Sequence, residues 1–218
     1  MTNQILFQKA KPIWIPGMEE EMNLHVNFHS KVFIKDVKET KVIITAATLY
    51  RMYVNDNCAG YGRGRARRGY RRVDEIEITN LLCEGVNKIK IEVAGYNCAS
   101  FYTVRQKSFL QAEVISGDLV LAYTGLDFFA ELVGKRIQKV MRYSYQRTFS
   151  EVWDMSKEDM VHDVSVVESP GYYLKRGVKN PHYKIYNQSK VLKKGSFTFK
   201  DVELKKDANA QGILNYLF

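Results

Sequence analysis

The chain has 218 residues, of which 45% are hydrophobic and 26% are charged. These proportions are ordinary for a folded globular protein, and fourteen Tyr and eleven Phe against four Pro exclude a largely disordered chain and favour strands. The formal net charge of +9 is compatible either with an acidic partner, such as nucleic acid, or with an ordinary solvated surface.

The first expected elements are an edge segment and a strand. Trp14 lies between two prolines, which lack a ladder donor and restrict the residue before them, so residues 11–17 are predicted to run along an edge. We expect the indole of Trp14 in the core, with a sugar platform as its alternative role. Residues 23–34 alternate, which predicts a strand with His25 and His29 on its more polar face.

The most regular pattern lies between residues 42 and 96. Residues 42–47 and 49–54 are strand-like, and the Asn-Asp-Asn run at 55–57 is typical of a turn, because short polar side chains tolerate left-handed backbone. Residues 75–79 and 88–93 alternate strictly between polar and apolar, as does a strand with one buried and one solvated face. We therefore take this stretch as the centre of the fold.

A Gly/Arg-rich segment, residues 60–72, has the most unusual composition in the chain. Guanidinium groups fork onto phosphates and tyrosines stack on bases, so a polyanion contact is one interpretation. Arginine is also frequent in protein interfaces, and we prefer a loop that faces another domain of the same polypeptide. The residues concerned are Arg63, Arg65, Arg67, Arg68, Arg71 and Arg72, with Tyr61 and Tyr70 between them.

The next residues are expected to complete a sandwich. Residues 108–123 alternate around a Ser-Gly-Asp turn and predict a hairpin. Residues 136–142 fit either a short helix or an irregular strand, and periodicity does not decide between them. Residues 146–154 are predicted to form a closing strand with Phe149 and Trp153 in the core.

After residue 155 the regular alternation of polar and apolar residues gives way to a polar stretch. Residues 155–162 are compatible with a helix, with Ser156 as its N-cap, and strand-like runs follow at 164–167 and 197–204. The whole pattern predicts an all-β protein. We expect a jelly-roll-like antiparallel β-sandwich of the galactose-binding-domain type over residues 1–155. Residues 156–218 are then a β-rich extension or the start of a further domain, and the chain is expected to be a fragment.

A series of short motifs runs through the central stretch. In order they are Tyr53-Val54-Asn55, Gly60, Val73-Asp74-Glu75, Leu81-Leu82, Gly85-Val86-Asn87, Ala94-Gly95-Tyr96-Asn97 and Ser108-Phe109-Leu110-Gln111-Ala112-Glu113. This ordered series resembles the N-terminal β-sandwich domain of bacterial α-L-rhamnosidases. The resemblance covers roughly residues 14–154.

The resemblance implies an accessory role. Members of that family carry their chemistry on a separate downstream barrel of paired helices, so the resemblance implies a non-catalytic domain that braces or extends the carbohydrate site of that barrel. The residues agree, because hydrolysis needs two carboxyl groups across one bond and no such pair can be chosen from this sequence. The alternatives are a carbohydrate-binding module in its own right and a basic nucleic-acid-binding module.

A sugar site is the second implication. Some members bind rhamnose on such a sandwich with calcium, an ion that needs six or more oxygen ligands. Here arginines stand where acidic ligands would be useful, so we expect no cofactor. The candidates for contact with a rhamnose-containing carbohydrate are Asn55, Asp56, Tyr61 and Tyr70, whose alternative role is turn and loop structure.

Three further expectations concern the environment of the chain. Cys58, Cys83 and Cys98 cannot all pair, and their spacing matches no zinc signature. Residues 1–10 lack the apolar core of a signal peptide, and no apolar run approaches transmembrane length. The sequence as written therefore predicts a cytoplasmic chain without a metal or a membrane partner, and removal of a signal would leave the same pattern.

Overall fold

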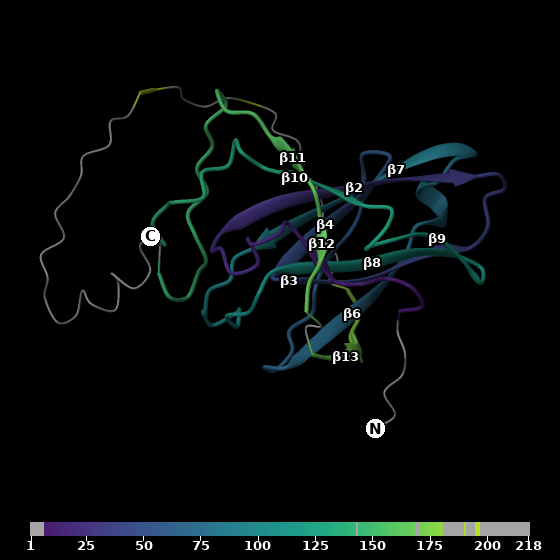
Figure 1. Ribbon diagram of the computed structural model, residues 1–218, viewed down its shortest axis with the longest axis horizontal. Coiled ribbons are helices and arrows are strands. Elements are labelled where there is room, and N and C mark those ends of the chain that lie inside the picture. The colour runs from purple at the N-terminus through teal and green to yellow at the C-terminus, as the bar shows by residue number, and fades with distance from the viewer. Residues whose placement is uncertain (1–6, 143, 169–170, 181–189, 191–194, 197–218) are drawn as a thin grey trace, which may run out of the picture.

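The computed structural model describes residues 7–142, 144–168, 171–180, 190 and 195–196. Within these residues thirteen strands form two sheets that face each other (Figure 1). The seven-stranded sheet has the order β12 (Ser165–Val166), β1 (Ile13–Trp14), β8 (Phe109–Ser116), β3 (Thr40–Ala47), β6 (Tyr70–Glu77) and β13 (Tyr172–Lys175), with β9 (Leu119–Tyr123) also paired to β8. The six-stranded sheet has the order β11 (Met160–His162), β10 (Phe129–Leu132), β2 (Leu24–Ile34), β7 (Gly85–Gly95), β4 (Leu49–Val54) and β5 (Asn57–Gly62).

Antiparallel pairing dominates, and the prediction of an all-β sandwich is confirmed. The exception is β13, which runs parallel to β6. One single-turn 3-10 helix, η1 (Thr79–Leu81), lies between β6 and β7. None of the helices in the described part of the chain is long and apolar enough to cross a membrane.

The alternating runs explain the six-stranded sheet. Strands β2 and β7 pair from Leu24 opposite Gly95 to Ile34 opposite Gly85, over their whole length. Their apolar positions lie in the core between the sheets and their polar positions face outward, so each strand buries one face. The outward positions of this sheet, among them His25, are where a surface site can form.

The seven-stranded sheet is covered on both faces. Its central strands β3 and β8 are buried at nearly every position. A second apolar cluster lies on the side away from the main core, and it includes Phe7, Ala10, Ile43, Val73 and Ile115. Because this outer face is covered by the N-terminal segment, the six-stranded sheet has the more open outer face.

The predicted turn at residues 55–57 is confirmed. Asn55 and Asp56 have φ values of 48° and 64°, the pair of left-handed residues that a type I′ hairpin turn requires. The side chain of Asn55 also donates to the carbonyl of Leu81 at 3.0 Å and accepts from the amide of Lys88 at 3.0 Å. These bonds tie the β4–β5 turn to β7.

Three predictions around the ends of the chain were wrong. Residues 155–162 form no helix, because Asp154 accepts bonds from the backbone amide and hydroxyl of Ser156 and closes a turn that leads into β11. Trp153 is 48% exposed rather than in the core. Strand β1 lies between β8 and β12 rather than at an edge, although Trp14 is fully buried as expected.

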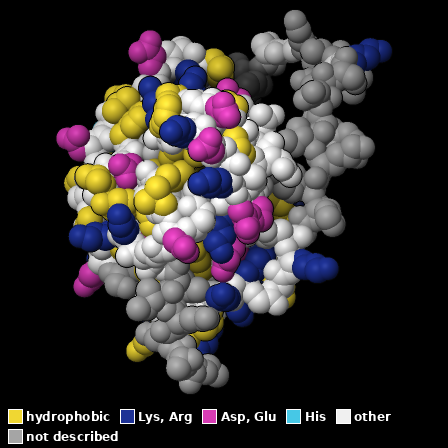
Figure 2. Space-filling view, turned by 90° about the vertical axis from the view of Figure 1, so that its right-hand side faces the viewer, with side chains coloured by type: hydrophobic (Ala, Val, Ile, Leu, Met, Phe, Trp, Pro, Cys, Tyr) yellow, Lys and Arg dark blue, Asp and Glu magenta, His cyan; other side chains and the backbone are white. Residues whose placement is uncertain are grey.

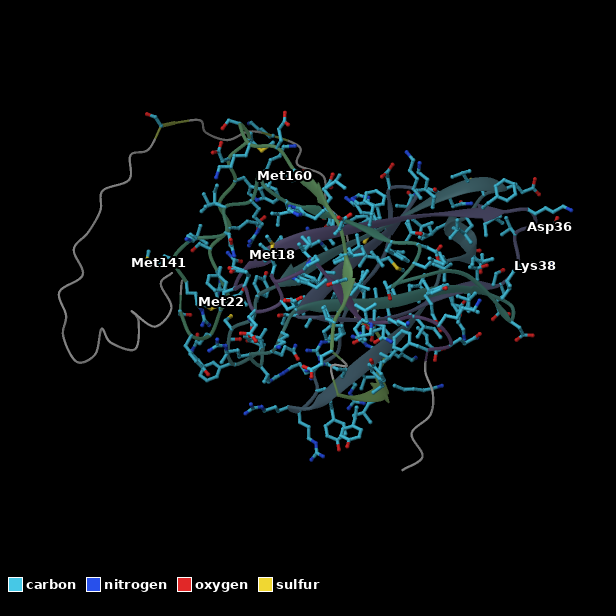
Figure 3. All side chains as sticks on the ribbon, in the orientation of Figure 1. Met18, Met22, Asp36, Lys38, Met141 and Met160 are labelled. Atoms are coloured by element: carbon cyan, nitrogen blue, oxygen red, sulfur yellow. The ribbon has the colours of Figure 1, made fainter. Side chains whose placement is uncertain are left out.

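The segment from residue 133 to 159 is mostly irregular. Within it Arg136 forms an isolated bridge with Trp153, and Arg142 forms one with Phe149. Residues 136–142 and 146–154 therefore pair with each other without building regular strands. The segment closes back on the end of the sandwich at which Met22 and Met141 are labelled, whereas Asp36 and Lys38 mark the opposite end (Figure 3).

Figure 2 views the molecule from the end that carries Asp36 and Lys38, with hydrophobic side chains lying among side chains of both charges. Phe33 and Val86, which are paired in register near this end, are 69% and 60% exposed. This end is therefore of mixed sign, and the basic character of the chain is not concentrated there.

Strands after residue 155 take part in both sheets. Strand β11 pairs with β10, β12 pairs with β1, and β13 pairs with β6. The predicted division of the chain near residue 155 stays a prediction, and the predicted run at 197–204 lies outside the described residues.

One buried carboxylate joins the two sheets. Asp74 on β6 is fully buried, and it accepts hydrogen bonds from the hydroxyl of Tyr50 on β4 at 2.6 Å and from Nη1 of Arg176 at 2.8 Å. Burial and the neighbouring carboxylate hold the pKa of Tyr50 well above its usual value, so the hydroxyl remains a donor. We call this set the Asp74 bridge.

Replacing Asp74 by Asn should destabilise the fold by about 3–5 kcal/mol, because it leaves the largely buried guanidinium of Arg176 without its counter-charge. Urea unfolding followed by circular dichroism measures this loss. The matched control is Glu75→Gln on the same strand, where partly exposed ion pairs with Lys41 and Lys175 are expected to contribute less than about 1 kcal/mol. Equal losses in the two variants would contradict the assignment.

Candidate functional site

A cleft of about 680 Å³ opens over the outer face of the six-stranded sheet. Its sheet side is formed by outward positions of four strands, namely His25 and Asn27 of β2, Arg51 of β4, Tyr61 of β5 and Glu92 of β7. Its other wall comes from the irregular segment and includes Arg136, Glu151, Trp153 and Asp159. The cleft is thus a product of the sheet and of a connection that lies against it.

Backbone bonds hold the irregular segment in place. The amide of Val133 donates to the carbonyl of His25 at 3.0 Å, which continues the pairing of β10 with β2. Further along, the side chain of Asn23 donates to the carbonyl of Gln138 at 2.7 Å, and Gln138 donates back to the carbonyl of Met22 at 2.9 Å. The wall is therefore fixed to the start of β2.

Trp153 provides an aromatic surface in this wall. Its ring is about half exposed, and its indole nitrogen donates to Glu151 at 2.8 Å. With the polar edge of the indole satisfied, the rest of the ring is left to make apolar contacts in the cleft. A flat ring with carboxylates beside it is the arrangement that a sugar can use, since its C–H face stacks and its hydroxyls donate.

The acidic groups of the cleft each have a partner in the chain. Glu92 lies 2.9 Å from Nε of Arg51 and 2.9 Å from Nζ of Lys90. Asp159 lies 3.7 Å from Nζ of Lys135 and accepts a hydrogen bond from the Lys135 amide. These pairs hold the carboxylates in position to accept hydrogen bonds.

The floor of the cleft rests on the Asp74 bridge. The backbone at Gly62 passes so close to Asp74 and to the ring of Tyr50 that a side chain at this position would collide with both. Glycine is therefore required here, and the next residue, Arg63, is directed to the cleft floor. Burial, together with the charge of Arg71, lowers the pKa of Arg63 to about 10.

The pKa of His25, which also lines the cleft, is strongly lowered as well. Its ring lies edge-on against Tyr96, with 5.5 Å between centroids, and its Nε2 is buried without a hydrogen-bond partner among the described residues. Burial lowers its pKa to about 3, and the charges of Arg136 and Arg51 act in the same direction. The ring is therefore neutral at physiological pH.

The four predicted sugar contacts are not brought together. Tyr61 lines the cleft, but Asn55 and Asp56 belong to the β4–β5 turn at the other end of β5, roughly 16 Å away at a rise of about 3.3 Å per residue. Tyr70 lies at the start of β6, where its ring packs on Tyr172 with 5.5 Å between centroids. Their role in sugar binding stays a prediction.

The Gly/Arg-rich segment is shorter as a loop than its composition suggested. Residues 60–62 end β5 and residues 70–72 begin β6. Within the connection, Arg65 donates to the carbonyl of Phe101 at 2.7 Å, and the guanidinium of Arg67 lies 4.2 Å from the ring centroid of Tyr70.

Of the other arginines of this segment, one is buried, one is bonded to the backbone and one is exposed. Arg71 is buried, and Arg72 donates to the carbonyl of Lys175 at 2.8 Å, which supports the parallel pairing of β13. Arg68 is exposed. The proposed interdomain or polyanion contacts of the six arginines stay predictions, but several of their donors already have acceptors inside this chain.

Sequence reasoning missed most of the cleft. Alternation did place His25 and Arg51 on outward faces, and the register puts Arg51 opposite Glu92 on the neighbouring strand. No local signal shows that a wall 40 residues or more downstream folds over them. Within the described residues, no group of three or more His, Cys, Asp or Glu side chains is arranged to hold a metal ion.

Neither a protein-family model nor a curated protein sequence matches this chain. Solved structures do match it. A family GH78 rhamnosidase of Bacillus sp. GL1 aligns with a TM-score of 0.72 and 21% identity, over 79% of this chain and 20% of the enzyme.

Two other α-L-rhamnosidases align less closely. The enzyme from Dictyoglumus thermophilum gives a TM-score of 0.59 at 15% identity, over 77% of this chain and 22% of its own. The enzyme from Aspergillus terreus gives 0.54 at 16% identity, over 75% and 22%. The structural neighbours agree with the resemblance seen in the motifs, and this chain spans about a fifth of the length of those enzymes.

Acid should weaken the fold through His25. The unfolded chain binds a proton at the ordinary pKa of 6.5, and the folded chain only near 3, so between these values the unfolded state holds more protons and stability falls as the pH falls. The slope for one such group approaches about 1.4 kcal/mol per pH unit. Unfolding free energies measured from pH 7 to pH 4 should show a shallower slope in His25→Gln. Asn27→Ala, which changes the next outward position of β2, should keep the original slope, and an unchanged slope in His25→Gln would contradict the assignment.

Proposed function

We propose that this chain is a non-catalytic, carbohydrate-associated domain of an α-L-rhamnosidase-like glycoside hydrolase. The observation that carries the proposal is the shared sandwich, which aligns over 79% of this chain with a fifth of a GH78 rhamnosidase. The ordered motifs from residue 14 to residue 154 support the same assignment. The partner is then a catalytic domain of the same polypeptide, and the ligand is a rhamnose-containing carbohydrate.

The cleft over the six-stranded sheet is the part that contacts the sugar in this proposal. It combines a half-exposed indole with oriented polar groups. Such a site can bind a sugar ring, because the indole packs on the apolar face and the polar groups bond to the hydroxyls. Glu92 and Asp159 serve as hydrogen-bond acceptors, since each is already held by a lysine or arginine.

The alternative of a nucleic-acid-binding module has less support. Sequence-indifferent binding needs cations that are free to contact phosphates. In this chain Arg65 and Arg72 donate to backbone carbonyls, and Arg67 lies over Tyr70 and donates to its hydroxyl. These engaged side chains have fewer donors left for phosphates.

The first test is catalytic. The purified chain should release no nitrophenol from p-nitrophenyl α-L-rhamnoside, whereas a polypeptide that joins it to its catalytic domain should hydrolyse this or a related glycoside. The physical reason is that an acid and a base must be held on opposite sides of one bond in a pocket that distorts the sugar ring. Turnover by the isolated chain that disappears in Glu92→Gln, Glu151→Gln or Asp159→Asn would place the reaction in this cleft and refute the proposal.

The second test is binding. The chain has two tryptophans, and Trp14 is fully buried while Trp153 lies in the cleft, so a change of indole fluorescence on adding methyl α-L-rhamnoside reports on the cleft. The change should vanish in Trp153→Phe. Binding measured by calorimetry should fall at least about tenfold in Trp153→Ala, because the ring face is lost. Tyr172→Ala, an exposed aromatic residue that does not line the cleft, is the matched control and should bind as the parent chain does.

A further inference from the structure

One cation at the cleft floor lacks the partner that the other charged groups have. Arg63 is mostly buried, and its Nε has no hydrogen-bond partner among the described residues. An unpaired buried guanidinium is unfavourable, because the water it has lost is replaced by no acceptor. Arg63 nevertheless lines the cleft, so a ligand there can supply the missing acceptor.

The nearest carboxylate does not satisfy Arg63. Asp74 attracts it through space, but its two oxygens already accept bonds from Tyr50 and Arg176. Arg71 lies close enough to repel it. The acids on the walls also have partners, namely Arg51 for Glu92, Lys135 for Asp159 and the indole of Trp153 for Glu151. Among the described residues, no carboxylate of the cleft forms an ion pair with Arg63.

A second guanidinium lies beside the first. Arg176 lines the same cleft, and one of its nitrogens is bound to Asp74 while its Nε is buried without a partner among the described residues. Its Cγ would lie 3.7 Å from a side chain added at Gly64, the residue after Arg63, so the two arginines occupy neighbouring positions. Together they present donors to one region of the floor.

We propose that the cleft recognises an acidic sugar, with the carboxylate of a uronic acid residue bound by Arg63 and assisted by Arg176. A carboxylate is planar and takes two parallel bonds from a guanidinium fork, which a neutral hydroxyl group cannot do. The sugar ring then lies toward Trp153, whose exposed face covers the apolar side of a pyranose. This inference rests on the proposed function, since it names the class of carbohydrate that the same cleft takes.

The test compares two ligands that differ at one group. Methyl β-D-glucuronide carries a carboxylate where methyl β-D-glucoside carries a hydroxymethyl group, so their affinities isolate the charge. Calorimetry with the whole chain should give tighter binding of the glucuronide by about tenfold to a hundredfold, the range for hydrogen bonds to a charged group. The preference should shrink as salt rises, because the cleft is open and the charge partly screened.

Variants locate the effect. Arg63→Gln should remove the preference for the glucuronide, and its thermal unfolding temperature should not fall, because no bond of the described residues is lost with the guanidinium. Arg68→Gln removes the same charge from an exposed position outside the cleft and should keep the preference. Arg63→Lys should keep part of it, since the charge remains and the fork does not, and this variant decides the question if Arg63→Gln does not fold.

The outcomes separate this inference from the proposed function. Binding of methyl α-L-rhamnoside in the cleft, with equal affinity for the glucuronide and the glucoside, would overturn the acidic-sugar assignment and leave the carbohydrate role standing. A glucuronide preference that survives in Arg63→Gln would also overturn it. If no sugar of any kind changes the fluorescence of Trp153, both the carbohydrate role of the cleft and the acidic-sugar assignment fail.

Discussion

The buried carboxylate of Asp74 sets the geometry on which the candidate site depends. It lies on β6 of one sheet, and its partners Tyr50 and Arg176 come from the other sheet and from the residue after β13. A buried carboxylate is stabilised where hydrogen-bond donors or an opposite charge surround it, so these three side chains fix how the sheets meet at this point. The same contact excludes any side chain at residue 62 and so places Arg63 on the cleft floor.

A second buried carboxylate is satisfied in a different way. Glu113 on β8 is fully buried and accepts three backbone amides, from Gln8, Lys9 and Ala10, at 2.8 to 3.0 Å. No cation is needed, because several oriented N–H groups can stabilise one anion. These bonds hold the N-terminal segment over the outer face of the seven-stranded sheet. They therefore also decide which sheet is left open to solvent, and the cleft forms on the other one.

The sequence predicted the parts of the fold that depend on local periodicity. Alternation identified β2, β4, β7 and β8, and the Asn-Asp pair identified the turn after β4, because these signals depend on neighbours in the chain. The wall of the cleft carries no such signal, since residues 133–159 pair irregularly and reach the sheet through long-range contacts. Trp153 shows why composition misled: a large aromatic ring is usually buried, but here Glu151 satisfies its indole nitrogen and the ring stays in the open cleft.

The sequence also did not predict the different roles of the arginines in residues 60–72. In the sequence the arginines form one basic segment, which suggests a single binding role for the net charge of +9. In the fold they separate, because Arg65 and Arg72 use their donors on carbonyls of this chain, while Arg63 is mostly buried near Asp74 and its Nε has no hydrogen-bond partner among the described residues. A charge that is exposed and already bonded contributes little to recognition, whereas one that is desolvated and unpaired interacts strongly with whatever anion reaches it. The electrostatic character of the cleft therefore depends on Arg63 and Arg176, whose Nε atoms are buried without a partner among the described residues, rather than on the number of arginines in the segment.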